Sequence, residues 1–278
     1  MSNIYEALLA PAMGPAEENE GDYRVDGILY CGKCNTPKEM LIPGFPNPNV
    51  SNMVRRVCKC QEARLEAEAK EQKKHERAIK IQETISALDR IGAIEHPTAT
   101  FGSSDCANVD NEQTMRKYAE RFDGLLKENI GMLLSGKNGS GKTFYAQCIA
   151  NELMERGYMV MYTSIRALAD APKDENSFVM DCVRKCDLLV IDDLYAERDT
   201  KYMAQKTFEV INARYEAKRP MIITTNIGIE DMATEQDQRY SRAFQRILQV
   251  CKPIVIAGGE RRMAVSAEKA AAWKKLME

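Results

Sequence analysis

The distribution of apolar residues predicts several buried strands in the C-terminal two thirds of the chain. Each strand candidate is a run of about five mostly apolar residues, and segments with apolar residues at helical spacing separate these runs. The strand candidates span residues 130–134, 158–163, 188–191, 221–226 and 253–257. Two of the helical stripes consist of Ala146, Ile149, Ala150 and Leu153, and of Tyr240, Phe244, Ile247 and Leu248. Strands that alternate with helices are typical of α/β folds with a parallel sheet, which is the fold class that we expect.

A different pattern precedes this region. In residues 61–80, eleven of twenty residues are charged, six basic and five acidic, and Gly and Pro are absent. We expect an exposed helix that is stabilised by pairs four residues apart, such as Glu66 with Lys70. An apolar stripe follows, formed by Ile81, Ile85, Leu88 and Ile91. Gly92 and Pro97 end the pattern, which predicts a semi-rigid helical linker; a solvated helix without a partner is the alternative for its first half.

Composition and charge narrow the class of protein. The 278 residues are 44% hydrophobic and 29% charged, which is ordinary for a soluble protein with a core. The formal net charge of −2 gives no overall basic signature of nucleic-acid binding, so any such contact must be local. No run of about 18 apolar residues is present to span a membrane. The first 22 residues lack the basic start and long apolar centre of a secretion signal. We therefore expect a cytoplasmic protein without a membrane partner.

Four of the nine cysteines form a candidate metal site near the N-terminus. Cys31 and Cys34 make a CxxC pair, and Cys58 and Cys60 make a CxC pair after 23 intervening residues. Two close pairs of thiolates suit tetrahedral Zn²⁺, which adds folding energy to small modules that bury little apolar area. Unrelated thiols or a redox pair are the alternatives, and a redox pair is disfavoured because no βαβ pattern surrounds the first two cysteines.

A glycine-rich loop follows the first strand candidate and fits the pattern G-x-x-x-x-G-K-[ST]. Its residues are Gly136, Lys137, Asn138, Gly139, Ser140, Gly141, Lys142 and Thr143. Glycines allow several backbone N–H groups to point at one anion, and the N-terminus of the following helix also favours phosphate. Lys142 would reach the β- and γ-phosphates of ATP, and the Thr143 hydroxyl would complete the coordination of Mg²⁺. The alternative is a chance turn rich in glycine and serine, against which both flanking elements argue.

Polar residues at the ends of two later strand candidates complete a predicted nucleotide site. Asp192 and Asp193 follow the apolar run 188–191, as in the Walker B pattern. Asp192 would act on Mg²⁺ directly or through water, and Asp193 would polarise the attacking water. Asn226 ends the run 221–226 and would hold the same water against the γ-phosphate. A turn residue that simply ends the strand is the alternative interpretation of Asn226.

Four arginines in the C-terminal part are candidate partners of phosphates. Arg242 and Arg246 lie one helical turn apart, a spacing that usually marks a solvated face. Alternatively, they supply charge to the site of a neighbouring subunit, because a guanidinium stabilises phosphoryl transfer in trans. Arg261 and Arg262 follow the last strand candidate after two glycines.

Together, these motifs resemble those of the AAA+ ATPases that load the bacterial replicative helicase, the DnaC/DnaI type, and most of all its short phage and Gram-positive forms. The resemblance covers nearly all of residues 30–262 and includes the cysteine-bearing part, the charged helix and the segment around Phe101. It implies an AAA+ P-loop core with a parallel sheet at residues 96–278. A zinc-binding module that contacts the helicase at residues 1–60 and a helical linker at residues 61–95 would precede this core.

The resemblance also implies roles for individual residues. The matched positions are Gly136 to Thr143 for Walker A, Asp192 and Asp193 for Walker B, Asn226 for sensor 1, Arg246 for the arginine finger and Arg242 for a second arginine. Either Arg261 or Arg262 matches sensor 2, and here Gly259 and Glu260 replace the usual serine or aromatic residue before it. The CxC pair is shorter than in some relatives, which makes Cys60 the least typical ligand.

The implied function is ATP-dependent loading of a hexameric replicative DNA helicase onto single-stranded DNA. ATP binding would order a ring or spiral of subunits, and ATP hydrolysis would release this assembly. Residues 1–95 would bind the helicase, and the ATPase domain would bind DNA, with Lys137, Arg166 and Lys173 as candidate contacts from their loop positions. The alternatives are a helper ATPase of transposition, a zinc-dependent adaptor with a nucleotide switch, and a small-molecule kinase, for which no acceptor-binding signature is present.

Overall fold

The computed structural model describes residues 15–41, 53–103, 109–194, 201–235, 238–257, 273–274 and 276–277. The chain divides into two compact units, Met1–Lys80 and Ile81–Glu278. Among the described residues, no helix combines the length and the apolarity required to cross a membrane. The three-part division of the chain at residues 60 and 95 stays a prediction.

The first unit contains two small antiparallel hairpins. Their strands are β1 (Tyr23–Val25) with β2 (Ile28–Tyr30), and β3 (Glu39–Leu41) with β4 (Met53–Arg55). Asp26 and Gly27 form the turn of the first hairpin with φ of 49° and 80°. Asp-Gly is favoured there because a two-residue hairpin turn requires positive φ at both positions. Strands of three residues bury little apolar area, so these hairpins belong to the type of module that a metal stabilises.

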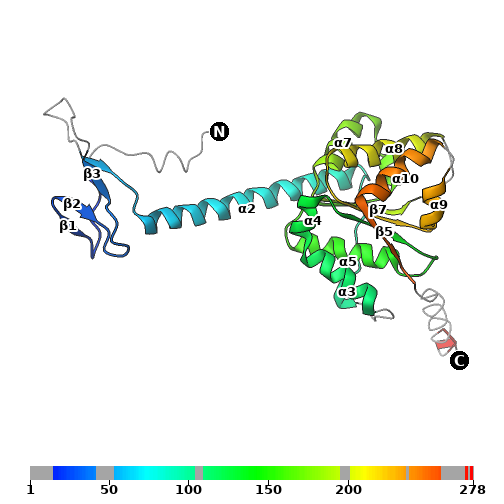
Figure 1. The fold of residues 1–278 in the computed structure, drawn as a ribbon, viewed down its shortest axis with the longest axis horizontal. Helices are drawn as coiled ribbons and strands as arrows, with labels where there is room; N and C mark the ends of the chain where they lie inside the picture. The colour runs from blue at the N-terminus through cyan, green and yellow to red at the C-terminus, as the bar shows by residue number, and fades with distance from the viewer. Residues whose placement is uncertain are drawn as a thin grey trace. The chain divides into compact units, whose positions relative to one another are not determined.

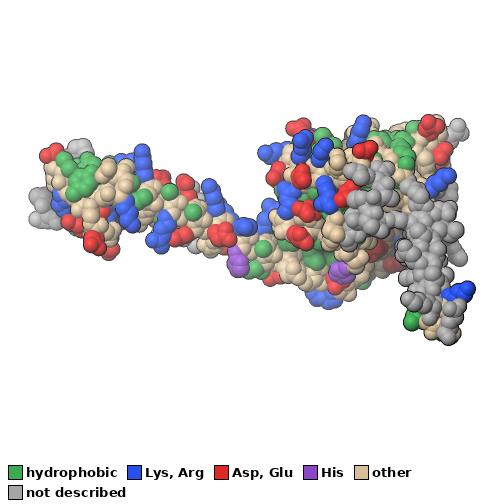
Figure 2. All heavy atoms as spheres, turned by 90° about the horizontal axis from the view of Figure 1, so that it is seen from below, with side chains coloured by type: hydrophobic (Ala, Val, Ile, Leu, Met, Phe, Trp, Pro, Cys, Tyr) green, Lys and Arg blue, Asp and Glu red, His purple; other side chains and the backbone are tan. Residues whose placement is uncertain are grey.

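The charged segment forms α2 (Lys59–Arg90), one unbroken helix of 32 residues. The predicted charged helix is confirmed, and Ile81, Ile85 and Leu88 of the predicted apolar stripe belong to the same helix, whereas Ile91 follows its end. Figure 2 shows basic and acidic side chains intermixed along its solvated part, where Arg64 Nε lies 2.7 Å from Glu68 Oε1. Leu88, near the end of the helix, is fully buried in the core of the second unit. Gly92 follows with φ of 68°, a conformation that suits the end of a helix.

The second unit is built on a five-stranded parallel sheet with the strand order β6-β7-β8-β5-β9. Its strands are β5 (Gly131–Ser135), β6 (Val160–Thr163), β7 (Leu188–Leu194), β8 (Met221–Thr225) and β9 (Cys251–Val255). All five predicted strands and the predicted parallel α/β fold are confirmed. One boundary differs in a way that bears on the site: β7 continues through Asp192 and Asp193 to Leu194, with a shift of register against β8.

Helices cover both faces of this sheet (Figure 1). The helices on one face are α3 (Val109–Glu120), α4 (Phe122–Glu128) and α5 (Lys142–Glu155). Those on the other face are α6 (Ile165–Asp170), α7 (Asn176–Lys185), α8 (Lys201–Glu216), α9 (Ile229–Thr234) and α10 (Gln238–Val250). The 3₁₀ turns are η1 (Phe101–Ser103) and η2 (Lys173–Glu175). The two apolar stripes of the sequence analysis, within residues 146–153 and 240–248, lie in α5 and α10, so these two predicted helices are confirmed.

Alternate strand residues pack into two separate apolar layers. Leu133 and Ile223 belong to the layer with α7, α8 and α10, whereas their neighbours Met132 and Ile222 belong to the layer with α3 and α5. This division follows from the alternation of side chains along a strand. In β5 to β8, where both faces are buried, each strand is a continuous apolar run and polar side chains are confined to the carboxyl ends, whereas β9 at the edge of the sheet carries the exposed Lys252. The candidate nucleotide site lies at these ends.

Candidate nucleotide site and candidate metal centre

The predicted phosphate loop lies between the carboxyl end of β5 and the first turn of α5. Gly139 and Gly141 have φ of 80° and 103°, a region that a side chain would strain. A Cβ added to Gly136 would lie 2.5 Å from the carbonyl oxygen of Ile256, the residue after β9. The N–H of Ile256 in turn donates to the carbonyl oxygen of Ser135 at 2.7 Å. The glycines therefore let the loop curl with its first residue packed directly against the chain that follows β9.

Lys142 is 6% exposed and lies inside the loop. Its Nζ donates to the carbonyl oxygens of Gly136 and Lys137, at 2.9 Å and 3.0 Å. It also donates to Asn226 Oδ1 at 2.7 Å. An ammonium group has three hydrogens, so these three acceptors occupy them in this state of the molecule. A phosphate in the loop would compete with the same acceptors for the lysine.

The Asp192 carboxylate accepts hydrogen bonds from hydroxyl groups on three different elements, α5, β6 and β8. Thr143 Oγ1 donates to its Oδ1 at 3.0 Å, and Thr224 Oγ1 donates to the same oxygen at 2.6 Å. The hydroxyl of Tyr162 donates to its Oδ2 at 2.7 Å. Both carboxylate oxygens are therefore oriented from the surrounding structure. The hydroxyl of Thr143 and the carboxylate of Asp192 lie side by side, and oxygen donors of this kind are the ligands that Mg²⁺ prefers.

Asp193 adopts a left-handed backbone conformation with φ of 53°. It lies within the register shift of β7, and its N–H donates to Thr224 Oγ1 at 2.7 Å. Its Oδ1 accepts a hydrogen bond of 3.3 Å from Asn226 Nδ2. Asn226 also accepts from Lys142, so a single amide connects the loop lysine with the second carboxylate. The structure therefore brings the predicted Walker A, Walker B and sensor 1 side chains into one hydrogen-bonded cluster.

Sequence patterns did not single out two side chains of this cluster, Tyr162 and Thr224. Thr224 lies in a predicted strand that ends in hydroxyl and amide residues, which is a weak signal. Tyr162 has no signal of its own, because a tyrosine inside an apolar run indicates only a buried strand. Ser140 is a further finding: its hydroxyl oxygen is buried and has no hydrogen-bond partner among the described residues. An unpaired hydroxyl in this loop fits a site that is completed by an anion.

The predicted arginines of α10 do not contact this cluster in their own chain. The guanidinium of Arg246 lies over the rings of Phe208 and Tyr215 on α8, 4.7 Å and 5.6 Å from their centroids. Its Nη1 is buried and has no hydrogen-bond partner within the described part of the chain. Arg242 is exposed on the same helix. Arg261 and Arg262, the sensor 2 candidates, lie outside the described residues.

The four predicted zinc ligands lie together in the first unit. The Sγ atoms of Cys31, Cys34, Cys58 and Cys60 all lie within 4.8 Å of one another. Cys60 Sγ is 3.6 Å from that of Cys31 and 3.4 Å from that of Cys58. Tetrahedral zinc with four bonds of about 2.3 Å separates its sulfur ligands by roughly 3.8 Å, so the cluster fits this metal. The residue that was least typical in the sequence, Cys60, is placed with the others.

Hydrogen bonds around the cluster support the ionised form of one thiol. The Thr36 hydroxyl and the backbone of Cys60 lower the pKa of Cys34 to about 6. The neighbouring sulfur atoms of Cys58 and Cys31 raise the pKa of Cys60 to about 12. Four thiols in contact resist simultaneous ionisation unless a cation lies among them, and Zn²⁺ would provide that cation. The residues that would hold it are therefore these four cysteines.

The fold of the chain matches that of AAA+ P-loop ATPases of known structure. The crystal structure of the DnaC helicase loader superimposes with a TM-score of 0.51 and 22% identity, covering 57% of this chain and 97% of that chain. The crystal structure of a DNA replication initiation factor gives a TM-score of 0.50 and 20% identity, covering 64% of this chain and 56% of that chain. At these identities the similarity establishes the fold alone.

Similar sequences occur among curated bacterial proteins. The replicative helicase loader DnaC of Escherichia coli K12 is 32% identical over 124 residues, which cover 42% of this chain and 49% of DnaC. The replicative helicase loader DnaI of Bacillus subtilis 168 is 28% identical over 147 residues, which cover 48% of this chain and 47% of DnaI. The chain thus spans about half the length of these curated relatives. The model of one protein family, the IstB-like ATP binding proteins, matches residues 65–269. Because this match covers most of the chain, including the phosphate loop and both aspartates, the chain belongs to the family of IstB-like ATP binding proteins.

Proposed function

We propose that this protein is an ATPase that loads a hexameric replicative DNA helicase onto single-stranded DNA. The observation that carries the proposal is the hydrogen-bonded cluster of Lys142, Asp192, Asp193 and Asn226 at the carboxyl ends of adjacent parallel strands. This cluster contains the types of group that bind phosphates, hold Mg²⁺ and activate water in phosphoryl transfer. The two helicase loaders with similar sequences, DnaC and DnaI, support the choice of target.

In the proposed reaction, the phosphate loop binds ATP and Asp193 acts on water. Lys142 exchanges the carbonyl oxygens of Gly136 and Lys137 for the β- and γ-phosphates. Thr143 and Asp192 would hold Mg²⁺, which neutralises charge on the phosphates when it is bound. Asp193 accepts a proton from the attacking water, while Asn226 orients that water. Arg246 of a neighbouring subunit would stabilise the charge that develops during transfer.

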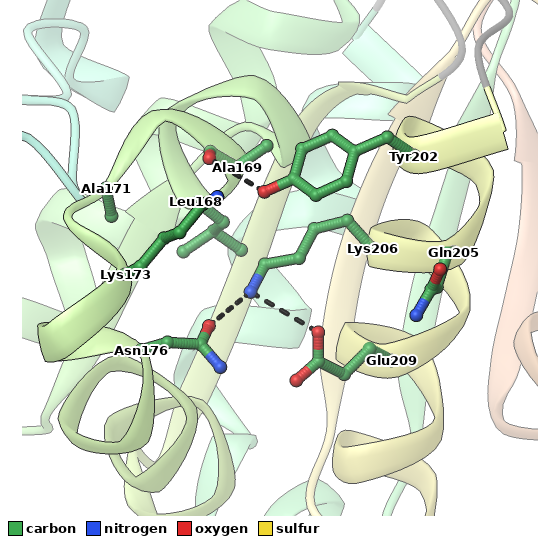
Figure 3. Close-up of a pocket in the computed structure, with 9 residues that line it drawn as sticks. All are labelled: Leu168, Ala169, Ala171, Lys173, Asn176, Tyr202, Gln205, Lys206 and Glu209. Carbon is green, nitrogen blue, oxygen red and sulfur yellow. Dashed lines mark hydrogen bonds and ion pairs between the residues drawn. The ribbon is translucent and has the colours of Figure 1, made fainter.

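A pocket between α6 and α8 supports the proposed contact with single-stranded DNA (Figure 3). It has a volume of about 230 Å³ and contains Lys173, one of the three predicted DNA contacts. Tyr202, which is 55% exposed, lines the same pocket and donates to the Ala169 carbonyl oxygen at 3.1 Å. Lys206 Nζ also lines the pocket; it donates to Asn176 Oδ1 at 2.6 Å and lies 3.4 Å from Glu209 Oε2. One aromatic ring beside two lysines suits a stacked base and a phosphate backbone.

The other two predicted DNA contacts lie elsewhere. Lys137 is exposed in the phosphate loop, and Arg166 lies on α6, where its Nε is 3.5 Å from Asp170 Oδ2. Neither lines the pocket between α6 and α8. The pocket therefore favours Lys173, together with Tyr202, as the DNA contact.

The loading activity predicts that the protein retains a replicative helicase on circular single-stranded DNA in the presence of ATP. Co-sedimentation of helicase with the DNA circle measures this directly. Deleting residues 1–60 should abolish capture of helicase, whereas Tyr202→Ala should preserve capture and reduce retention on the circle, since stacking is worth about 1–3 kcal/mol per base. Trp273, which is 66% exposed in the second unit, provides a matched control: Trp273→Ala removes an aromatic side chain that does not line the pocket and lies outside residues 1–60. Capture of a transposase in place of helicase would support the transposition-helper alternative.

Asp193→Asn should reduce ATP hydrolysis by about 100-fold or more while ATP binding is unchanged, because general base catalysis contributes this much. Asn tolerates the left-handed conformation at φ of 53°. It also keeps an Oδ1 acceptor for Asn226, so the substitution removes little besides the charge. Phosphate release and binding of a fluorescent ATP analogue are the two measurements.

Asp26→Asn is a matched control, since Asp26 also has positive φ, 49°, but lies in the β1–β2 turn. A zinc-dependent adaptor with a nucleotide switch would need Lys142 and would still function with Asp193→Asn. Hydrolysis by Asp193→Asn at the unchanged rate would overturn the role of Asp193. Loading of helicase that persists in this variant after hydrolysis is lost would favour that adaptor.

A further inference from the structure

The two oxygens of Asp192 have different surroundings. Oδ1 lies next to Thr143 and also accepts from Thr224, whereas Oδ2 accepts from Tyr162. In a phosphate loop of this pattern, the hydroxyl of Thr143 is the group that turns to Mg²⁺. Oδ1 is therefore the oxygen on the metal side of the carboxylate. Once Thr143 coordinates the metal, the described hydroxyls that remain on Asp192 are those of Thr224 and Tyr162.

The position of Tyr162 in the fold directs its hydroxyl toward this carboxylate. The residue is 2% exposed and lies in the apolar layer with α3 and α5, so its ring has a fixed position. The parallel register places Tyr162 opposite Val190, two residues before Asp192, and the hydroxyl reaches the carboxylate from the neighbouring strand. The hydroxyl of this fixed ring is therefore positioned to donate to Oδ2 of Asp192.

We propose that Tyr162 is a positioning residue that fixes the Asp192 carboxylate for Mg²⁺ and thereby sets the concentration of Mg²⁺ that the nucleotide site requires. The inference rests on the proposed function, because it assumes that the site binds ATP with this metal. Without the phenol, Asp192 is held through Oδ1 alone and can rotate about its terminal bond. The metal would then have to order the carboxylate, and its apparent affinity would fall.

A tyrosine with only a packing role would behave differently. Its ring would contribute to the core, and loss of the hydroxyl would lower the stability of the fold without changing any dependence on metal. The two roles are therefore separated by the Mg²⁺ dependence of nucleotide binding, which can be read without any turnover.

The test is Tyr162→Phe, which keeps the ring and removes one oxygen. Binding of a fluorescent ATP analogue is titrated with Mg²⁺ on the full chain, below the unfolding temperature of each variant. Ordering one side chain costs about 0.5–1.5 kcal/mol, so the Mg²⁺ concentration at half-saturation should rise about two- to tenfold. Affinity for the analogue in EDTA should be unchanged. Substitution of Mn²⁺, which binds more tightly to such ligands, should restore much of the lost binding.

Tyr158→Phe is the matched control, because Tyr158 also donates to an aspartate, Asp123, at 2.5 Å but belongs to no part of the nucleotide cluster. It should leave the Mg²⁺ midpoint unchanged. An unchanged midpoint in Tyr162→Phe overturns the inference and leaves the proposed function intact. The proposed function itself is overturned if the protein without substitutions does not bind the analogue, or binds it equally well with and without Mg²⁺. A midpoint that rises equally in both variants would also overturn the specific role of Tyr162.

Discussion

ATP hydrolysis should return when chains with Arg246→Ala are mixed with chains with Lys142→Ala, although neither variant is active alone. The first variant keeps an intact phosphate loop, and the second keeps the arginine. A mixed assembly therefore contains interfaces at which an intact loop meets an intact guanidinium. An arginine supplied in trans contributes about 10³-fold or more to phosphoryl transfer, so each variant alone should lose at least that much. Phosphate release at fixed total protein concentration measures both the loss and the recovery.

The surroundings of Arg246 give this experiment its physical basis. Two aromatic rings of α8 hold the guanidinium, and its buried Nη1 lacks an acceptor among the described residues of its own chain. Arg116→Ala is a matched control, because Arg116 also lies 4.7 Å over a ring, that of Phe101. It should keep ATP hydrolysis close to the unchanged rate. Mixed assemblies that form but stay inactive would contradict a role of Arg246 in trans, and so would dilute monomers that hydrolyse ATP as fast as assemblies.

Cys34→Ser should remove zinc and unfold the first unit while the second unit keeps its structure. Structural zinc contributes about 10–16 kcal/mol of apparent binding energy in comparable small modules, far more than two hairpins of three-residue strands gain from burial. Zinc content per chain and hydrogen exchange of the hairpin N–H groups are the two measurements. The N–H of Cys31, which donates to the Thr36 carbonyl oxygen at 2.9 Å, should lose its protection.

Cys148→Ser provides the control for this experiment. Cys148 is a buried thiol of α5 in the other unit, and burial raises its pKa to about 12. The variant should be less stable in the second unit and should still bind one zinc per chain. Retention of zinc by Cys34→Ser would contradict the four-cysteine site, as would zinc loss that leaves the hairpins protected.

The strands and the phosphate loop were predictable because their signals are local. A strand that is buried on both faces needs apolar residues at every position, and the loop needs glycines at fixed spacing. By contrast, α8 was not predicted, because its buried residues include Lys206, Thr207 and Arg214 and therefore do not form an apolar stripe in the sequence. Arg214 is fully buried and donates to backbone carbonyl oxygens such as that of Pro220. No periodicity distinguishes such an arginine from a solvated one.

The partners of the site residues were predictable only in part, because they depend on which strands are neighbours. Asp192 and Asn226 could be assigned from the ends of apolar runs. That Tyr162 and Thr224 flank Asp192 follows from the strand order β6-β7-β8, which sequence periodicity does not contain. The position of Arg246 over Phe208 likewise depends on how α10 packs against α8. Contacts between distant segments are therefore the part of the site that required the structure.

The contact between Gly136 and Ile256 has a consequence for the synthesis of the protein. β5 pairs with β8 on one side and with β9 on the other, and the first residue of the phosphate loop rests on the chain just after β9. A nascent chain on the ribosome could form α5 early, but its loop would lack this support until residue 256 had left the exit tunnel. Affinity for ATP would then appear late in translation and abruptly, so a partly made chain would not compete for nucleotide with finished molecules.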